Sequence, residues 1–372
     1  MKKITILGAG LVGKCMAIDL CHDYDVTSAD RDVQILNEIR SEHPINTIEA
    51  DFKDPQKIRE VIKEADLVVG AVPGFMGFEM LKAVITAGKN IADISFFPED
   101  PFELDELAKK HDVTAVVDCG VAPGMGNIIL GYHNEHMTVD KFTCYVGGLP
   151  KIRSWPFEYK APFSPIDVIE EYTRPARIVK NGNIEIMPAL SEPELLEFNQ
   201  VGTLEAFNTD GLRTVLKTMS VPNMIEKTLR YPRHIELIRV FRELGFFDDN
   251  PIDIKGTAIK PIDLTSTLLF KNWKLEKNDE EFTVMKVIVE GEEKGKSVKH
   301  EYDLLDRYDQ KTQMSSMART TGYTCTGVSR LIADGRFVRK GICPPEYVGA
   351  AEGCFQALLD YLKERGVFYT KH

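Results

Sequence analysis

Six residues near the start of the chain have the types and spacing that bind a dinucleotide. Gly8-Ala9-Gly10-Leu11-Val12-Gly13 matches the pattern G-x-G-x-x-G. In such a loop the first glycine permits a tight turn, the second lets backbone approach a pyrophosphate, and the third allows a helix to pack on the preceding strand. Free N–H groups at the start of that helix favour phosphate. The motif predicts a nucleotide site, although glycine turns without a ligand are common.

Residues beyond this loop extend the predicted nucleotide site. Asp30 follows the glycines by about 20 residues, where a carboxylate bonds the ribose hydroxyls of NAD and repels the 2′-phosphate of NADP. We therefore predict NAD as the cofactor, with NADP as the alternative because Arg31 could tolerate it. Asp51 is expected to contact adenine or to cap a turn. Ala71-Val72-Pro73 is expected to lie against the nicotinamide ribose.

Two further carboxyl groups are candidates for chemistry on an amine. Asp93 and Asp118 each end an apolar segment that we expect to reach the nicotinamide. A carboxyl group there could bind a substrate ammonium ion or, with a raised pKa, act as a base. The alternative for each is an acid that only caps the next turn. Cys119 is not expected to be a nucleophile, because hydride transfer from an amine needs no covalent intermediate.

A basic segment in the second half of the chain supplies candidate substrate-binding groups. Arg230 could hold a substrate carboxylate with two parallel hydrogen bonds. His234 could relay protons, because histidine titrates near neutral pH. The alternatives are an ordinary surface arginine and a solvated, basic start of a helix. Gly147-Gly148 would let backbone approach the substrate or would simply turn a hairpin.

Alternating strands and helices are expected to position the nucleotide site. Short apolar, β-branched segments predict strands at residues 3–7, 24–28, 47–51, 66–72, 90–94 and 114–117. Apolar residues at helical spacing predict helices at residues 14–22, 55–64, 78–87 and 101–111. This alternation is typical of a doubly wound parallel sheet, an α/β Rossmann fold that binds ligands beyond the carboxyl ends of its strands.

The pattern changes after about residue 126. Residues 141–146 predict a strand that ends in a sharp loop at Gly147-Gly148-Leu149-Pro150, and residues 282–304 alternate like a hairpin, which together predict a mixed sheet. Helices are expected at residues 232–244, 317–333 and 350–365. We predict a Rossmann domain of residues 1–126 and 318–372, and an α+β substrate and dimerisation domain of residues 127–317.

Motifs spread over nearly the whole chain give it a resemblance to a known superfamily. Besides the glycine loop and Lys14, these motifs are Asp118-Cys119-Gly120-Val121-Ala122-Pro123-Gly124-Met125, Tyr145-Val146-Gly147-Gly148-Leu149-Pro150, Leu204-Glu205-Ala206-Phe207, Lys227-Thr228-Leu229-Arg230-Tyr231-Pro232-Arg233-His234 and Met317-Ala318-Arg319-Thr320-Thr321-Gly322-Tyr323. On these motifs the chain resembles the saccharopine dehydrogenase superfamily, most closely the lysine 6-dehydrogenases.

The resemblance implies an activity and an assembly. It implies NAD-linked oxidation of the ε-amine of L-lysine, or of a close diamino acid, to an imine that hydrolyses to the semialdehyde and ammonia. It also implies a homodimer of two-domain protomers. Saccharopine reductases carry Asp where Ala122 stands and Tyr near Phe96, which argues against saccharopine itself. The alternatives are reductive condensation of the saccharopine or carboxynorspermidine type, and an NAD-binding regulatory protein without turnover.

Composition limits the partners that we expect. The net charge of −11 over 372 residues opposes binding to nucleic acid or to an anionic membrane surface. No apolar stretch approaches the roughly 18 residues of a membrane span, and Lys14 interrupts the first apolar run, so no signal peptide is expected. The seven cysteines include no C-x-x-C pair, which predicts neither a disulfide framework nor a metal site. We expect a soluble, cytoplasmic enzyme with a small-molecule substrate.

Overall fold

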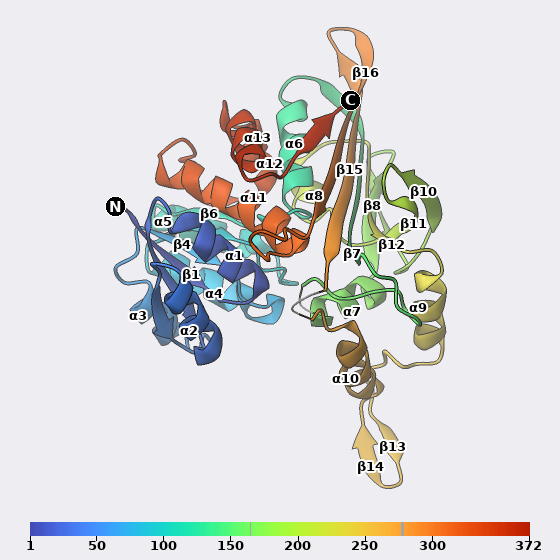
Figure 1. The fold of residues 1–372 in the computed structure, drawn as a ribbon. Coiled ribbons are helices and arrows are strands. Elements are labelled where there is room, and N and C mark those ends of the chain that lie inside the picture. The colour runs from blue at the N-terminus through green and yellow to red at the C-terminus, as the bar shows by residue number, and fades with distance from the viewer. Residues whose placement is uncertain (164, 277–278) are drawn as a thin grey trace. The chain divides into compact units, whose positions relative to one another are not determined.

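The computed structural model describes residues 1–163, 165–276 and 279–372 (Figure 1). The chain divides into two compact units. Unit 1 comprises Met1–Thr138, Glu293–Gly295 and Met317–Tyr369, and unit 2 comprises Val139–Glu292, Lys296–Ser316 and Thr370–His372. Unit 1 is therefore discontinuous in sequence, with its last segment arriving after nearly all of unit 2.

Unit 1 is built on a seven-stranded sheet in the order β17-β6-β5-β4-β1-β2-β3. The strands are β1 (Lys3–Leu7), β2 (Asp25–Asp30), β3 (Asn46–Glu49), β4 (Leu67–Gly70), β5 (Asn90–Asp93), β6 (Thr114–Val116) and β17 (Gly341–Cys343). Every pairing between them is parallel. The strand order reverses between β1 and β4, so the predicted doubly wound sheet is confirmed.

Burial explains why the central strands are almost purely apolar. Ile4 and Ile6 of β1 and Val68 and Val69 of β4 have no exposed surface. Successive side chains of a strand point to opposite faces, so both faces of the sheet are covered. The helices that alternate with the strands provide this cover (Figure 1).

The helices of unit 1 include three that were not predicted, at residues 33–42, 125–134 and 345–350, and one that begins earlier than predicted. The helices of this unit are α1 (Leu11–Leu20), α2 (Val33–Glu42), α3 (Pro55–Val61), α4 (Gly74–Thr86), the short 3₁₀ helix η1 (Pro101–Leu104), α5 (Asp105–Lys110), α6 (Met125–Asn134), α11 (Ser316–Ala333), α12 (Pro345–Ala350) and α13 (Cys354–Glu364). Helix α4 begins at Gly74 rather than at residue 78. Helix α2 was not predicted, although Asp32 is a typical N-cap that accepts the Gln34 N–H at 2.9 Å.

Unit 2 contains a nine-stranded mixed sheet, as the alternating segments predicted. Its strands are β7 (Thr138–Pro150), β8 (Ala176–Lys180), β9 (Asn183–Met187), β10 (Glu194–Phe198), β11 (Gly202–Asn208), β12 (Asn223–Arg230), β15 (Glu281–Glu293), β16 (Lys296–Arg307) and β18 (Tyr369–Lys371). Strand β12 pairs parallel with β7 and antiparallel with β11.

Shorter elements complete unit 2. The helices are α7 (Pro165–Thr173), α8 (Val215–Thr218), α9 (His234–Glu243) and α10 (Pro261–Trp273), and β13 (Ile252–Ile254) pairs with β14 (Thr257–Ile259) in a separate hairpin. Throughout the described residues of both units, no helix is long and apolar enough to cross a membrane.

The loop predicted at Gly147-Gly148 is wrong. Both glycines are buried inside β7, which continues to Pro150. A Cβ atom at Gly147 would lie 2.6 Å from the carbonyl oxygen of Leu229 on β12. Close approach of two strands therefore requires glycine at this position, and a turn does not. Substrate contact by these glycines stays a prediction.

Candidate active site

The glycine loop between β1 and α1 has the geometry of a phosphate cradle. Gly8 has a φ of 110°, and a Cβ atom there would lie 2.4 Å from the carbonyl oxygen of Ala71, just beyond β4. A Cβ atom at Gly13 would lie 2.0 Å from the carbonyl oxygen of Gly8. A Cβ at Gly10, in contrast, would meet nothing within 4 Å, and no side chain caps α1 there. The loop thus fits a dinucleotide, with open space where phosphate would approach.

Asp30 joins the glycine loop to the start of α2. Its Oδ2 accepts the N–H of Ala9 at 2.7 Å, and its Oδ1 accepts the N–H of Asp32 at 2.9 Å. The carboxylate therefore lies at the end of β2, against the cradle that Ala9 and its neighbours form. Arg31 is exposed beside it. Asp51 accepts the N–H of Lys53 at 3.1 Å, which is the turn-capping contact considered above.

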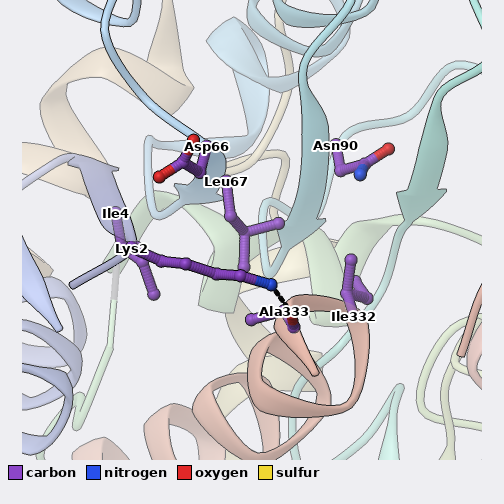
Figure 2. Close-up of a pocket in the computed structure, with 7 residues that line it drawn as sticks. All are labelled: Lys2, Ile4, Asp66, Leu67, Asn90, Ile332 and Ala333. Carbon is purple, nitrogen blue, oxygen red and sulfur yellow. Dashed lines mark hydrogen bonds between the residues drawn. The ribbon is translucent and has the colours of Figure 1, made fainter. Parts of the chain in front are cut away.

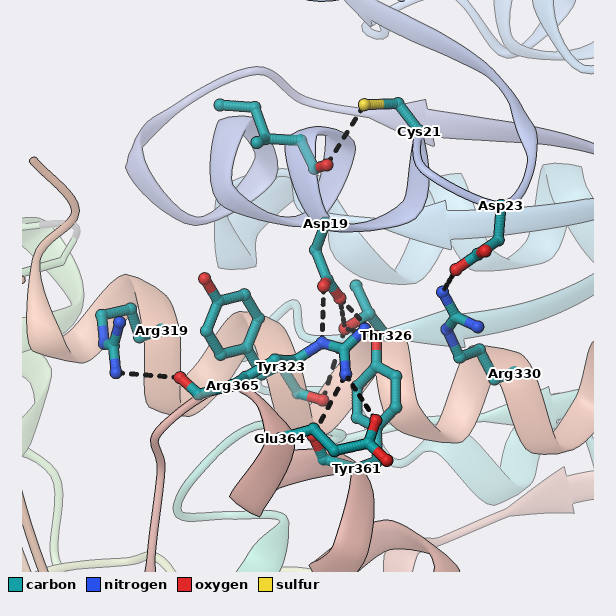
Figure 3. Close-up of polar contacts among 11 residues, drawn as sticks. Asp19, Cys21, Asp23, Arg319, Tyr323, Thr326, Arg330, Tyr361, Glu364 and Arg365 are labelled. Carbon is teal, nitrogen blue, oxygen red and sulfur yellow. Dashed lines mark hydrogen bonds and ion pairs between the residues drawn. The ribbon is translucent and has the colours of Figure 1, made fainter. Parts of the chain in front are cut away.

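A buried polar network, which the sequence did not reveal, fixes helix α1 (Figure 3). Oδ1 of Asp19 accepts the Arg365 Nε–H at 2.6 Å, and Oδ2 accepts the Thr326 hydroxyl at 2.5 Å. The Tyr361 hydroxyl also donates to Oδ2. Helices α11 and α13 thereby hold the helix that follows the glycine loop. The acidic residue in the largely apolar segment of α1 was a signal visible in the sequence. Its partners could not be predicted, because they lie more than 300 positions away.

Asp93 ends β5 as a completely buried acid. Its Oδ1 accepts both the hydroxyl of Ser95 at 2.8 Å and the Ser95 N–H at 3.1 Å, while Oδ2 has no hydrogen-bond partner among the described residues. Burial raises the pKa of this carboxyl to about 7; the Ser95 bonds oppose the rise and the nearby Asp118 charge adds to it. A carboxyl group that titrates near neutral pH is suited to acid–base work.

Asp118 follows β6 and is brought to the same edge of the sheet. It is buried and has a left-handed φ of 52°. The Cys119 N–H donates to the carbonyl oxygen of Asp93 at 2.9 Å, which ties the two strand ends together. We call Asp93 and Asp118 the carboxyl pair. Burial beside a second acid makes Asp118 a candidate site residue, and its role stays a prediction.

The cysteines nearby have the character of core residues. Cys119 and Cys325 of α11 are completely buried, and the pKa of Cys325 is raised well above its usual value by its bond to Cys119 and by burial. Thiols in this state are poor nucleophiles. That Cys119 forms no covalent intermediate stays a prediction.

In unit 2, Arg230 lies in a buried hydrogen-bonded group that we call the arginine cluster: Arg230, Glu171, Tyr159, Tyr172 and His234. Its Nη2 donates to Glu171 at 2.6 Å, its Nε to the Tyr172 hydroxyl at 3.2 Å, and its guanidinium stacks on the Tyr159 ring at 4.4 Å. The surface-arginine alternative is therefore wrong. The predicted grip on a substrate carboxylate would require Glu171 to give way.

His234 belongs to the same cluster and is not solvated. Its Nε2 lies 2.9 Å from the Tyr172 hydroxyl and its Nδ1 lies 2.8 Å from the carbonyl oxygen of Phe157. Burial, together with the Arg230 charge, lowers its pKa to about 3. The expectation that His234 titrates near neutral pH is therefore wrong, and so is the solvated helix start. A neutral imidazole with both ring nitrogens hydrogen-bonded instead holds the Tyr172 hydroxyl and the Phe157 backbone in place.

A small cavity lies in unit 1 (Figure 2). It has a volume of about 240 Å³ and is lined by Lys2, Ile4, Asp66, Leu67, Asn90, Ile332 and Ala333. These residues stand at the amino ends of β1, β4 and β5 and at the end of α11, where the Lys2 ammonium donates to the Ala333 carbonyl. Because ligands of such sheets bind at the carboxyl ends, this cavity is not the predicted site.

Comparison with known proteins identifies the family. The model described as "Saccharopine dehydrogenase NADP binding domain" matches residues 4–116, and the model described as "Saccharopine dehydrogenase C-terminal domain" matches residues 120–367. The chain belongs to the saccharopine dehydrogenase family. This confirms the resemblance drawn from the sequence at the level of the superfamily. The first match also indicates a domain that binds a nicotinamide nucleotide.

Curated relatives of the family are distant and longer than this chain. Mitochondrial alpha-aminoadipic semialdehyde synthase from Bos taurus is 20% identical over 443 residues, which cover 99% of this chain and 47% of the relative. Saccharopine dehydrogenase [NADP(+), L-glutamate-forming] from Pyricularia oryzae is 25% identical over 67% of this chain and 58% of the relative. The chain thus spans about half the length of these two relatives.

Solved structures share the fold over the whole chain. Apo saccharopine dehydrogenase (L-Glu forming) from Saccharomyces cerevisiae has a TM-score of 0.81 at 18% identity, covering 100% of this chain and 99% of the other. Homospermidine synthase from Legionella pneumophila, solved with NAD, has a TM-score of 0.65 at 14% identity and covers 100% and 91%. The combination of a Rossmann-like sheet and a second mixed sheet is therefore that of this family.

Proposed function

We propose that this protein is an NAD-dependent amine dehydrogenase that acts on the ε-amine of L-lysine or of a close diamino acid. The products are the semialdehyde and ammonia. The observation that carries the proposal is the carboxyl pair, which lies at the carboxyl ends of β5 and β6 in a sheet whose β1–α1 loop fits a dinucleotide. Negative charge at that edge suits a substrate that enters as an ammonium ion and leaves as an iminium ion.

The residues of unit 1 supply three requirements of this reaction. The cradle of Gly8, Gly10 and Gly13 would hold the pyrophosphate, and NAD, when bound, accepts the hydride from the amine-bearing carbon. Asp118 would attract the substrate ammonium. The ammonium must lose one proton before its carbon can give up a hydride, and a carboxyl group with a pKa near 7 suits that step.

Asp30 supports NAD over NADP. Its carboxylate stands at the end of β2 against the glycine loop, where a 2′-phosphate would meet a negative charge. The matching family model and the Pyricularia oryzae relative carry NADP in their names. The ratio of dissociation constants for the two cofactors tests the choice, and tighter binding of NADP would refute it.

A second candidate is saccharopine-type chemistry, in which an amino acid takes the place of ammonia. The names of the relatives favour it. Ala122 and Phe96 stand against it, because saccharopine reductases resemble this chain but carry polar residues at or near these positions. In both reactions a hydride leaves a carbon that bears nitrogen, so the same carboxyl pair would serve either one.

Product analysis separates the two candidates. The purified protein is incubated with NAD and L-lysine, and NADH and ammonia are measured in parallel. Equal amounts of both establish oxidative deamination of lysine. NADH formed only from saccharopine, with glutamate as the second product, establishes the second candidate instead. Cofactor binding without oxidation of any diamino acid would refute both and favour a regulatory protein.

We also propose that the protein is a homodimer, as the resemblance implies. Unit 2 presents exposed apolar side chains on α9, α10 and the β13–β14 hairpin, among them Val240, Leu244, Ile252, Leu264 and Leu268. Exposed apolar residues gathered on neighbouring elements are typical of subunit interfaces. Light scattering measures the mass in solution, and a monomer would contradict the proposal.

A further inference from the structure

The two carboxylate oxygens of Asp93 have opposite surroundings. Oδ1 accepts both donors that Ser95 offers, at 2.8 Å and 3.1 Å. Oδ2 is equally buried but has no partner within the part of the chain that the structure describes. The backbone carbonyl of Asp93 accepts the Cys119 N–H at 2.9 Å, which fixes the strand end that carries this side chain. An oxygen buried without a donor is a poor place for negative charge and a good place for a proton.

The groups that face Asp93 reinforce this asymmetry. Asp118, on the loop after β6, carries the same sign of charge. Cys325, on α11, is a protonated thiol that senses the Asp93 charge. From the β4 side, Gly70 approaches so closely that a Cβ atom there would lie 2.2 Å from Oδ1 and 2.7 Å from the Met80 Cε. None of these neighbours is a cation that could stabilise an ionised Asp93.

We propose that protonation and ionisation of Asp93 at Oδ2 set the charge at the nicotinamide end of the cofactor site. A doubly wound sheet binds the nicotinamide half of a dinucleotide over its second set of strands, here β4 to β6. The oxidised ring is cationic and the reduced ring is neutral. An ionised Asp93 therefore favours NAD⁺, whereas a protonated Asp93 does not. The inference depends on one part of the proposed function, namely that a nicotinamide cofactor binds at this edge of the sheet.

The test uses binary complexes of the full chain with NAD⁺ or NADH, without an amine substrate. Dissociation constants are measured between about pH 6 and pH 8, on either side of the raised pKa of Asp93. The preference for NAD⁺ over NADH is expected to increase about tenfold across this range, because the ionised carboxylate attracts the cationic ring and not the neutral one. Asp93→Asn, which imitates the protonated acid, should keep the low-pH preference throughout.

A second variant keeps the test valid if Asp93→Asn does not fold. Ser95→Ala removes one donor that stabilises the carboxylate. The step, by which we mean the change in the preference for NAD⁺ over NADH with pH, should therefore occur at a higher pH. Ser28→Ala is the matched control, because Ser28 is also completely buried in the sheet and its hydroxyl has no partner among the described residues. It should leave the step in place. Asp66→Asn, at the opposite edge of the sheet, controls for the change from acid to amide.

Infrared difference spectra between wild type and Asp93→Asn provide a readout independent of the cofactor. The carbonyl stretch of a protonated carboxylic acid should be present at the lower pH and absent at the higher. An Asp93 that is ionised at both pH values, or a wild type and Asp93→Asn with the same pH dependence of cofactor preference, would overturn the inference. Inactivity toward all amines, with the step still present, would refute only the proposed function.

Discussion

The carboxyl pair of unit 1 and the arginine cluster of unit 2 are both buried polar groups, but they differ in how fully their polar atoms are hydrogen-bonded. In the arginine cluster, Arg230 forms an ion pair with Glu171, and both ring nitrogens of His234 are hydrogen-bonded. In the carboxyl pair, two acids adjoin and one oxygen of Asp93 has no partner among the described residues. A completed network specifies a fold, whereas an incomplete one is retained at a cost to stability. This difference supports the proposal that the chemistry takes place in unit 1.

The largest expected effect comes from breaking the arginine cluster. Glu171→Ala would leave the Arg230 guanidinium, which is 2% exposed, buried without its carboxylate. Removal of one partner from a buried ion pair costs about 3–5 kcal/mol of unfolding free energy. Urea unfolding measures this loss. The control is Glu170→Ala, because Glu170 bonds Arg174 in a more exposed pair and its loss should cost under about 1 kcal/mol. Equal losses in the two variants would contradict a structural role for the cluster.

The carboxyl pair should behave in the opposite way, since Asp93→Asn is expected to stabilise the protein. The fold raises the pKa of Asp93 from 3.8 to about 7, so it penalises the carboxylate. The native state loses stability as pH rises from about 4 to about 7. The gain from Asp93→Asn should therefore grow over that range and level off above it, reaching at most about 4 kcal/mol. A gain that does not depend on pH would show that Asp93 is ionised in the fold.

His234 should give a smaller pH dependence of reversed sign. The fold lowers its pKa from 6.5 to about 3, so it penalises the protonated ring. Stability from this group is complete above about pH 6.5 and is lost as pH falls, by about 2 kcal/mol at pH 5. His234→Gln should remove that part of the slope in urea unfolding. His22→Gln, at an exposed position, is the control and should leave the slope unchanged.

The smallest effect is expected at the cofactor end of unit 1. Asp30→Asn keeps an oxygen that can accept the Ala9 N–H but removes the charge. The preference for NAD over NADP should fall by about tenfold, equivalent to about 1.4 kcal/mol. Binding titrations with the two reduced cofactors measure it. An unchanged ratio would remove Asp30 from cofactor discrimination.

The sequence predicted unit 1 better than unit 2 for a physical reason. The glycine loop, the apolar strands and Asp30 are local signals, and the doubly wound sheet follows from their order. Strand β17 was missed because Gly341–Cys343 is short and its partner β6 lies far back in the chain. Helix α2 was missed because only Leu36 and Ile39 are buried in it, too few to produce a clear apolar period.

The candidate site was predicted in part. The positions of Asp93 and Asp118 at strand ends were visible in the sequence, whereas the missing partner of Oδ2 was not. The sequence placed Arg230 and His234 correctly in one segment but not their burial. Their environment comes from Glu171 and Tyr172 on α7, and contacts between distant segments leave no local pattern.

The Asp19 network has a consequence for how the protein is made. Helix α1 is translated more than 300 residues before Thr326, Tyr361 and Arg365, which hold its buried carboxylate and follow nearly all of unit 2. A nascent chain therefore carries a glycine loop whose supporting helix still lacks its anchor. Full support for the glycine loop should therefore appear only after Arg365 has been translated, and the partly made sheet is exposed to misfolding in that interval.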